Sequence, residues 1–380
     1  MRLLVAGFYA NGPGYPNGRM TQAILSAVPG LEVVDLGYPM SQGLELWKIG
    51  KAGLVHAFSL VVQCIVLNAR SALRVAVAKP GVQDLVYVRY PSVFFMSFIS
   101  LFPRKVRPRC VVEAFIPVWD SMFNDRGRGR RGVRAQLVRY MESRSLRAAW
   151  RVIVDTEANA DFVAQQLGVG RESVTSIPLA VEESAWRGVR HSVKAGNSFR
   201  VLFVGTLIRL HGLEVICEAI RLFRSGEPFE FVFVGDGQEA HTLRKLITDR
   251  PDLSIVWHRE WIDTDKVAVA MADADVSLGV FGGKGKASRV LPFKVYMALA
   301  VGVPVVTQRD FSVPARAPAP PVVAVQPEAS ALAEAIRTLR GALDKRFWLH
   351  AEGRRYFDAY LSHEAVLRGW ERVLTSRNVD

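Results

Sequence analysis

Short apolar runs alternate with segments of helical periodicity along almost the whole chain, and no other feature of the sequence constrains the fold as much. Apolar strands that alternate with helices are typical of parallel sheets covered on both faces. For 380 residues the pattern predicts two domains, because single cores usually stop growing near about 250–300 residues. The expected strands are residues 3–7, 31–36, 85–89, 110–115 and 151–155 in the first half and 200–204, 229–234, 254–258, 275–281, 303–307 and 322–325 in the second.

The fold class predicted from this alternation is α/β, with two doubly wound, Rossmann-like domains. A polar stretch without periodicity predicts a linker at residues 186–198, between a first domain at 1–185 and a second at 199–360. Residues 361–380 are expected to form a C-terminal helix. Ligands of such sheets bind beyond the carboxyl ends of the strands, so two facing domains predict one central cleft.

The positive charge of the chain is concentrated in its first half. The net charge is +13, and residues 101–151 hold 13 Lys and Arg against four Asp and Glu. A basic face suits nucleic acid, an anionic membrane or a phosphorylated substrate, and the alternative is a solvated arginine-rich helix. Near an anionic leaflet each basic side chain contributes roughly 1 kcal/mol, so five or six on one face would hold a protein there.

Cysteine usage and the apolar segments indicate a cytoplasmic protein. Cys64, Cys110 and Cys217 lie far apart in apolar runs with no CxxC pair and no histidine cluster, so we expect buried thiols and no metal site. The N-terminal run 1–8 does not read as a signal peptide, and the apolar stretch 54–67 is too short to span a bilayer. The expectation is a soluble protein or one on the inner face of a membrane.

The segment 276–306 contains the strongest candidate for an anion site. Gly282 and Gly283 allow a tight turn after a strand, and Pro292 stands where a helix begins. Lys294 lies in the first turn of that helix, where a cation opposes the helix dipole by roughly 0.3–1 kcal/mol. A bound diphosphate would remove this conflict, because free backbone N–H groups and the lysine would both contact it. The alternative is a solvated lysine on a core-packed helix.

Two further strand ends point to the same region. Gly205 and Thr206 follow the strand 200–204, and small residues there let a ligand approach the backbone. Arg209 and His211 come next and could contact phosphate. Gly235 opens the Gly-Asp-Gly turn after the strand 229–234. Ordinary loops between strands and helices remain the alternative for both segments.

These segments, in this order, carry a family resemblance. The motifs GTL…HG, FVGDGQE and ADVSLGVFGG…KA.RVLPFKVYMALAVGVPVVT resemble the C-terminal domain of the large retaining glycosyltransferase family numbered four. In the first half, VVEAFIPVWDSMFNDR and RVIVDTEANADFV are similar to stretches of the same group. The likeness is strong over residues 201–307, moderate over 85–178 and poor before residue 84.

The resemblance implies a GT-B fold, a nucleotide diphosphate sugar donor bound by the C-terminal domain, and transfer with retention. It implies neither a metal ion nor a cofactor, because positive side chains stabilise the leaving diphosphate. The C-terminal helix of such enzymes packs back on the first domain. The donor-binding residues expected on these grounds are Gly205, Thr206, Arg209, His211, Gly235, Gly283, Lys286, Arg289 and Lys294.

The chain also departs from the wider family. Thr206 and His211 stand where the family has an arginine and a lysine, and Arg289 and Met297 stand where it has two glutamates. The second glutamate holds the ribose hydroxyls, and a methionine is only a weak hydrogen-bond acceptor. Loss of a charged acceptor weakens binding by roughly 1.5–3 kcal/mol. Either another group holds the nucleoside, or the chain binds donors poorly.

On the acceptor side, Glu113 and Asp120 are the predicted catalytic residues. They could orient an acceptor hydroxyl, and the alternative is a set of surface ion pairs with the neighbouring arginines. The basic segment 104–151, together with Phe94, Phe95 and Phe98, favours a lipid-linked acceptor and an anionic membrane surface as partner.

The function predicted from the sequence is a glycosyltransferase of polysaccharide or glycoconjugate synthesis. Met297 and His211 favour the first alternative, an inactive GT-B module that serves as a partner or regulatory subunit. A nucleotide-sugar epimerase on the same fold is the second alternative. A nucleic-acid-binding role would explain the charge but not the donor-domain motifs, so no nucleic acid partner is expected.

Overall fold

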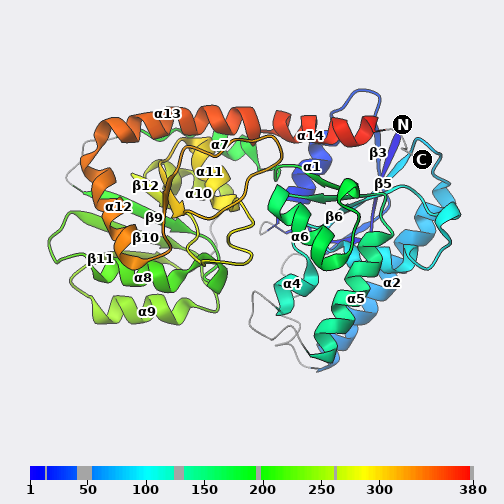
Figure 1. Ribbon diagram of the computed structural model, residues 1–380, viewed down its shortest axis with the longest axis horizontal. Helices are drawn as coiled ribbons and strands as arrows, with labels where there is room; N and C mark the ends of the chain where they lie inside the picture. The colour runs from blue at the N-terminus through cyan, green and yellow to red at the C-terminus, as the bar shows by residue number, and fades with distance from the viewer. Residues whose placement is uncertain (13–14, 41–53, 124–131, 194–197, 261–262, 377–380) are drawn as a thin grey trace. The chain divides into compact units, whose positions relative to one another are not determined.

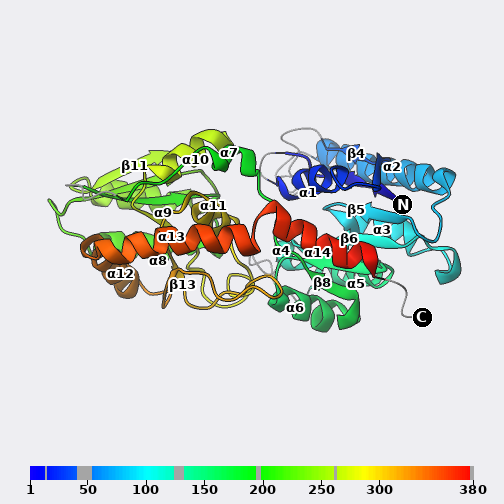
Figure 2. The same ribbon diagram turned by 90° about the horizontal axis from the view of Figure 1, so that it is seen from above.

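The computed structural model describes residues 1–12, 15–40, 54–123, 132–193, 198–260 and 263–376 (Figures 1 and 2). The chain forms two compact units, one of Met1–Ala180 with Val366–Asp380 and one of Val181–Ala365. The first part of the predicted linker 186–198 belongs to the second unit, where Trp186 and His191 are buried. The burial of these two side chains was not predicted, because the segment is polar and has no periodicity.

The first unit is built on a six-stranded parallel sheet, and the strand order is β3-β1-β5-β6-β7-β8. Since β1 and β5 are neighbours from which the chain proceeds in opposite directions, the switch point of the sheet lies between them. A short parallel pair, β2 (Phe8–Tyr9) and β4 (Tyr38–Pro39), continues beyond the sheet. The strands are β1 (Arg2–Ala6), β3 (Glu32–Asp35), β5 (Leu85–Val88), β6 (Cys110–Glu113), β7 (Arg151–Val154) and β8 (Val174–Ser176).

Helices cover both faces of the first sheet. One apolar cluster takes residues from α2 (Leu54–Ala78), α3 (Ser92–Ile99), α5 (Val133–Arg147) and α6 (Glu157–Leu167). The cluster on the other face joins α1 (Asn17–Ser26) and α14 (His363–Thr375). Trp370 of α14 packs edge-on against Tyr87 of β5, with ring centroids 4.9 Å apart. The C-terminal helix therefore completes the core of the first unit. The remaining helix, α4 (Val118–Phe123), packs against α5.

The second unit is built on a parallel sheet with the strand order β11-β10-β9-β12-β13-β14. This is the order of dinucleotide-binding folds, and the switch point lies between β9 and β12. The strands are β9 (Phe199–Val204), β10 (Phe229–Val234), β11 (Ser254–His258), β12 (Val276–Leu278), β13 (Val305–Gln308) and β14 (Val323–Val325). The loops after β9 and β12 are therefore the expected place for a ligand.

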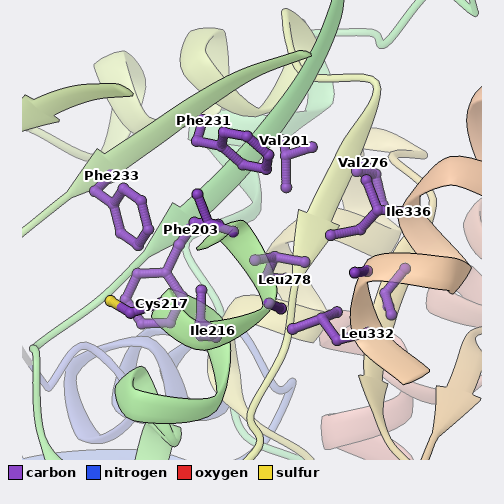
Figure 3. Packing of buried hydrophobic residues seen from close by; sticks show 14 of the residues in the cluster. Val201, Phe203, Ile216, Cys217, Phe231, Phe233, Val276, Leu278, Leu332 and Ile336 are labelled. Atoms are coloured by element: carbon purple, nitrogen blue, oxygen red, sulfur yellow. The ribbon is translucent and has the colours of Figure 1, made fainter. Parts of the chain in front are cut away.

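An aromatic-rich core packs between this sheet and the helices α8 (Leu213–Arg221), α9 (Ala240–Asp249) and α12 (Ala329–Gly341). Figure 3 shows Phe203, Phe231 and Phe233 from the strands against Ile216 and Cys217 of α8. On the other side of the sheet lie α10 (Thr264–Ala272) and α11 (Phe293–Val301) (Figure 1). They pack with α7 (Glu183–Arg187), and α11 also packs with α13 (Leu343–Tyr360).

Helix α2 extends beyond the apolar stretch 54–67. The stretch 54–67 was expected to be too short for a bilayer span, but α2 has 25 residues and continues to Ala78. Residues Phe58–Ala78 are long and apolar enough to cross a membrane, and 28% of their most apolar window is buried. Polar side chains nevertheless tie α2 to the sheet. Asn68 Oδ1 accepts from the Phe8 amide at 3.0 Å, and Ser71 Oγ accepts from the Gly7 amide at 2.9 Å.

We expect Asn68→Ala to lower the free energy of unfolding by about 1–3 kcal/mol, because the buried Phe8 amide would lose its partner. Urea unfolding followed by circular dichroism measures the change. The control is Gln63→Ala on the exposed side of α2, which should shift the transition by less than about 0.5 kcal/mol. Equal effects of the two substitutions would contradict the proposed anchoring of α2.

Candidate functional site

The loops after β9 and β12 are in close backbone contact, and glycines make this contact possible. Gly212 has a φ of 67°, and a side chain there would overlap the carbonyl carbon of Phe281. A side chain on Gly282 would overlap the carbonyl oxygen of Leu210. The Phe281 amide donates to the carbonyl oxygen of His211 at 3.0 Å. The two loops therefore form one unit at the switch point of the second sheet.

Lys294 lies beneath these loops with its amine buried. The residue is only 5% exposed, although it lies in the first turn of α11. Its Nζ lies 3.6 Å from the centroid of the Phe203 ring, and no described hydrogen-bond acceptor reaches it. Gly205 follows β9 with a φ of 139°, and a Cβ there would lie 3.2 Å from Lys294 Nζ. The amine is therefore held at the carboxyl end of β9 without an ion pair.

Burial controls the charge of both titratable groups at this position. Desolvation holds the pKa of Lys294 well below its ordinary value of 10.5. The pKa of His211 is also held well below its usual range, first by burial and then by the nearby charge of Lys294. His211 Nδ1 donates to the carbonyl oxygen of Thr206 at 2.5 Å, which leaves Nε2 as an acceptor on a neutral ring.

This arrangement suits an anion that contacts backbone amides. Pro292 at the start of α11 supplies no side-chain cap, so the first amides of the helix have no side-chain partner there. The amides and the buried amine lie at the same end of the helix. A diphosphate would be the missing counter-charge for Lys294 and would satisfy the helix amides.

The remaining predicted residues lie in the segments that follow β9, β10 and β12. Gly235 has a φ of 126°, and a side chain there would overlap the carbonyl oxygen of Gly205. Arg209 is exposed in the short 3-10 turn Arg209–His211. Lys286 and Arg289 are half-buried in the segment that leads into α11.

Sequence reasoning missed two residues of this site. The Phe203 ring forms the apolar wall beside Lys294, and its place at the end of an aromatic-rich strand gave no sign of a role. Gln308, the last residue of β13, is fully buried and contacts Gly283. Its side chain accepts from the Gly283 amide at 2.8 Å and donates to the Gly283 carbonyl oxygen at 2.9 Å. The only sign of this role in the sequence is that Gln308 is a polar residue directly after a predicted apolar strand.

The two predicted acceptor-side carboxylates lie inside the first unit. Glu113 is 1% exposed, and it accepts from the Tyr87 hydroxyl at 2.5 Å and the Asn17 amide group at 2.9 Å. Burial raises the pKa of Glu113. Asp120 is fully buried in α4. Neither carboxylate therefore lies at the surface, and a role in orienting an acceptor stays a prediction.

A cavity of about 350 Å³ lies at the switch point of the first sheet. Arg89 follows β5 there, and its guanidinium carbon lies 4.0 Å from the centroid of the Tyr9 ring. Arg89 is buried and donates to neutral oxygens only, those of Gln22 and Ala10 at 3.1 Å and of Asn11 at 3.4 Å. The cavity is therefore a polar recess that contains a buried arginine, and it lies in the unit that the sequence predicts to bind the acceptor.

Comparison with known proteins finds a family likeness in the second unit. Residues 198–341 match the sequence model of the family described as glycosyl transferases group 1. No curated protein matches the chain by sequence. The second unit is therefore similar to group 1 glycosyltransferase domains, in agreement with the resemblance that its motifs carry.

Solved structures extend the likeness to the whole chain. HepE from Anabaena in complex with UDP is 14% identical, with 99% of this chain and all of that chain covered and a TM-score of 0.67. Sucrose-phosphate synthase from Thermosynechococcus elongatus is 14% identical over 98% of each chain, with a TM-score of 0.70. OtsA is 11% identical over all of both chains, with a TM-score of 0.68. These likenesses confirm the predicted GT-B fold.

We expect Lys294→Met to stabilise the chain by roughly 1–3 kcal/mol at neutral pH, because it removes an unpaired buried amine. Burial lowers the pKa of Lys294 in the folded chain, so the unfolded chain binds the proton more tightly below about pH 10.5. The gain should therefore shrink as the pH rises towards 10.5. Urea unfolding at several pH values checks this, and a gain independent of pH would contradict it.

Proposed function

We propose that this chain, whose fold is GT-B and whose second unit is similar to group 1 glycosyltransferase domains, moves a sugar from a nucleotide diphosphate sugar to an acceptor hydroxyl. The transfer retains the anomeric configuration and uses no metal ion. The observation that carries the proposal is the buried, unpaired amine of Lys294 at the amino end of α11. A group desolvated to this extent is costly for stability, and a recurring anionic ligand accounts for it.

In this proposal the donor diphosphate lies against the first amides of α11. The bond between the anomeric carbon and the diphosphate breaks, and negative charge grows on the leaving oxygen. Protonated Lys294 and the helix amides stabilise that charge in a site with little water. The acceptor oxygen bonds to the anomeric carbon on the same face, and the acceptor proton passes to the leaving diphosphate.

A cationic side chain takes the part that a metal ion has in other transferases. The Lys294 amine is within contact distance of a group placed beside Gly205, because only a hydrogen occupies that side of the glycine. Neutral His211 adds an acceptor for a hydroxyl or amide of the donor without adding competing charge.

The identity of the nucleoside is open to a direct test. HepE structures were obtained with UDP and with UDP-glucose, which makes uridine donors the first choice for this chain. Met297 is half-buried on α11 one turn after Lys294, where the resembled family has its ribose-binding glutamate. The proposed nucleoside contact therefore comes from another group of the second unit.

A second candidate is a GT-B module that binds a partner without transferring sugar, and Met297 favours it. A panel of UDP- and GDP-sugars distinguishes the two functions, because an inactive module would show no turnover with any acceptor. An epimerase would convert the donor without an acceptor.

We expect UDP to bind the wild-type protein with uptake of a proton, because the diphosphate raises the lowered pKa of Lys294. Affinity should therefore fall as the pH rises above about 7, where the phosphate of UDP is already ionised. Calorimetry in buffers of different ionisation enthalpy measures the uptake. Lys294→Met should lose the uptake and bind roughly 10- to 150-fold more weakly, the effect of losing about 1.5–3 kcal/mol.

The matched control for this measurement is Lys245→Met, an exposed lysine on α9 that should leave UDP affinity unchanged. The anomeric coupling constant of the product shows whether the configuration is retained. Sugar transfer in the presence of a metal chelator shows whether the reaction needs a metal ion. Unchanged UDP affinity in Lys294→Met, or no binding of any nucleotide, would remove the basis of the proposal.

A further inference from the structure

Helix α2 exposes an apolar surface to solvent. Only a narrow stripe of the helix is buried against the first unit, and it includes Leu60, Cys64 and Val75. On the outer side, Phe58 is 71% exposed, Leu73 is 65% exposed and Val77 is 72% exposed. Val61, Val62, Ile65 and Val66 are exposed as well. A soluble domain rarely leaves so many large apolar side chains on one helix without a partner.

The apolar surface continues on α5. Helix α3 packs against both α2 and α5, and the three helices lie on the same side of the first sheet (Figures 1 and 2). The outer side of α5 exposes Val133, Leu137, Tyr140 and Met141, with Val133 at 87% exposed. We call the exposed side chains of these two helices the α2–α5 face.

Every charged side chain exposed on the α2–α5 face is positive. The sequence has no acidic residue between Glu45 and Asp84, and Arg70 and Arg74 are exposed on α2. Arg134 and Arg144 are exposed on α5. The one acidic residue of α5, Glu142, is buried and accepts from the amides of Val118 and Trp119.

This combination fits an anionic lipid surface. A helix with apolar and basic side chains on its outer side lies in the plane of the membrane interface, and arginine stems reach from the apolar layer to the headgroups. We propose that the α2–α5 face docks the first unit on an anionic bilayer. Phe95, one of the aromatic residues expected at such a surface, is fully buried, so α2 and α5 supply the contact instead.

The helix lies on the bilayer and does not cross it. Asn68 and Ser71 accept from the amides of Phe8 and Gly7 beside β1, and a spanning α2 would leave these buried amides unpaired. The exposed arginines also fix the depth, because their charges must stay at the headgroups.

A protein held at a bilayer would meet lipid-linked acceptors, which fits the acceptor predicted from the sequence. That consequence rests on the proposed glycosyltransferase function, whereas docking itself requires no donor. Vesicle binding and UDP binding therefore fail independently of one another.

The test is cosedimentation of the purified protein with vesicles of phosphatidylcholine and phosphatidylglycerol, compared with vesicles of phosphatidylcholine alone. We expect retention on the anionic vesicles and release at high salt. Arg70→Gln/Arg74→Gln should weaken binding about 10- to 30-fold, since each basic side chain contributes about 1 kcal/mol. Ile65→Asn/Leu73→Asn should lower binding to the anionic vesicles to the binding that the wild-type protein shows with phosphatidylcholine alone.

Matched controls come from exposed residues of the second unit. Arg244→Gln/Lys245→Gln and Val269→Asn change the same kinds of side chain away from the α2–α5 face and should keep full vesicle binding. Circular dichroism and UDP affinity show whether each variant is folded.

Two outcomes would overturn the proposal. The first is wild-type protein that stays in the supernatant with both kinds of vesicle, or controls that lose binding as much as the α2 variants do. The second is a wild-type dimer that the α2 variants convert to a monomer with vesicle affinity unchanged, since a second copy would then cover the face.

Discussion

The burial of one lysine amine without an ion pair is the constraint on which the second unit depends. Lys294 Nζ lies against the Phe203 ring, at the end of β9 and the start of α11, and no described acceptor reaches it. Burying a charge unpaired costs several kcal/mol, so the group loses its proton more readily than an ordinary lysine. An anion bound at this position would pair with the protonated amine and offset the cost of burying its charge. Relief of this cost would contribute to the binding free energy of a phosphate-bearing ligand.

The topology explains why the amine lies where it does. In a sheet of order β11-β10-β9-β12-β13-β14 the switch point lies between β9 and β12, and such sheets bind ligands beside the loops that follow these two strands. Glycine at positions 212 and 282 lets the two loops approach closely, and glycine at position 205 leaves room for the amine of Lys294. The first sheet repeats the principle, with Arg89 at the switch point between β1 and β5. Each unit thus presents a buried cation at the place where a parallel sheet binds ligands.

Periodicity was sufficient to predict most strands, because parallel strands buried on both faces are continuous apolar runs. The motifs around Gly205 and Lys294 pointed to two positions that the structure brings together at the start of α11. Spacing along the chain did not reveal that Lys294 is buried, because that depends on Phe203, ninety-one positions earlier. The burial of Glu113 was not predictable from the sequence for the same reason, because its partners Asn17 and Tyr87 come from distant segments. Trp186 and His191 were hidden in a polar sequence that resembled a linker.

The path of the chain makes the second unit an insertion in the first. The polypeptide leaves the first unit after Ala180 and returns to it at Val366. The His363 amide donates to Glu183, and its ring nitrogen Nε2 lies 2.6 Å from the Val181 carbonyl oxygen, so both ends of the insertion are joined. Trp370, which closes the core over Tyr87, is therefore synthesised only after the entire insertion. During translation the first unit stays incomplete until the second has emerged, and the inserted unit is the one that can mature first.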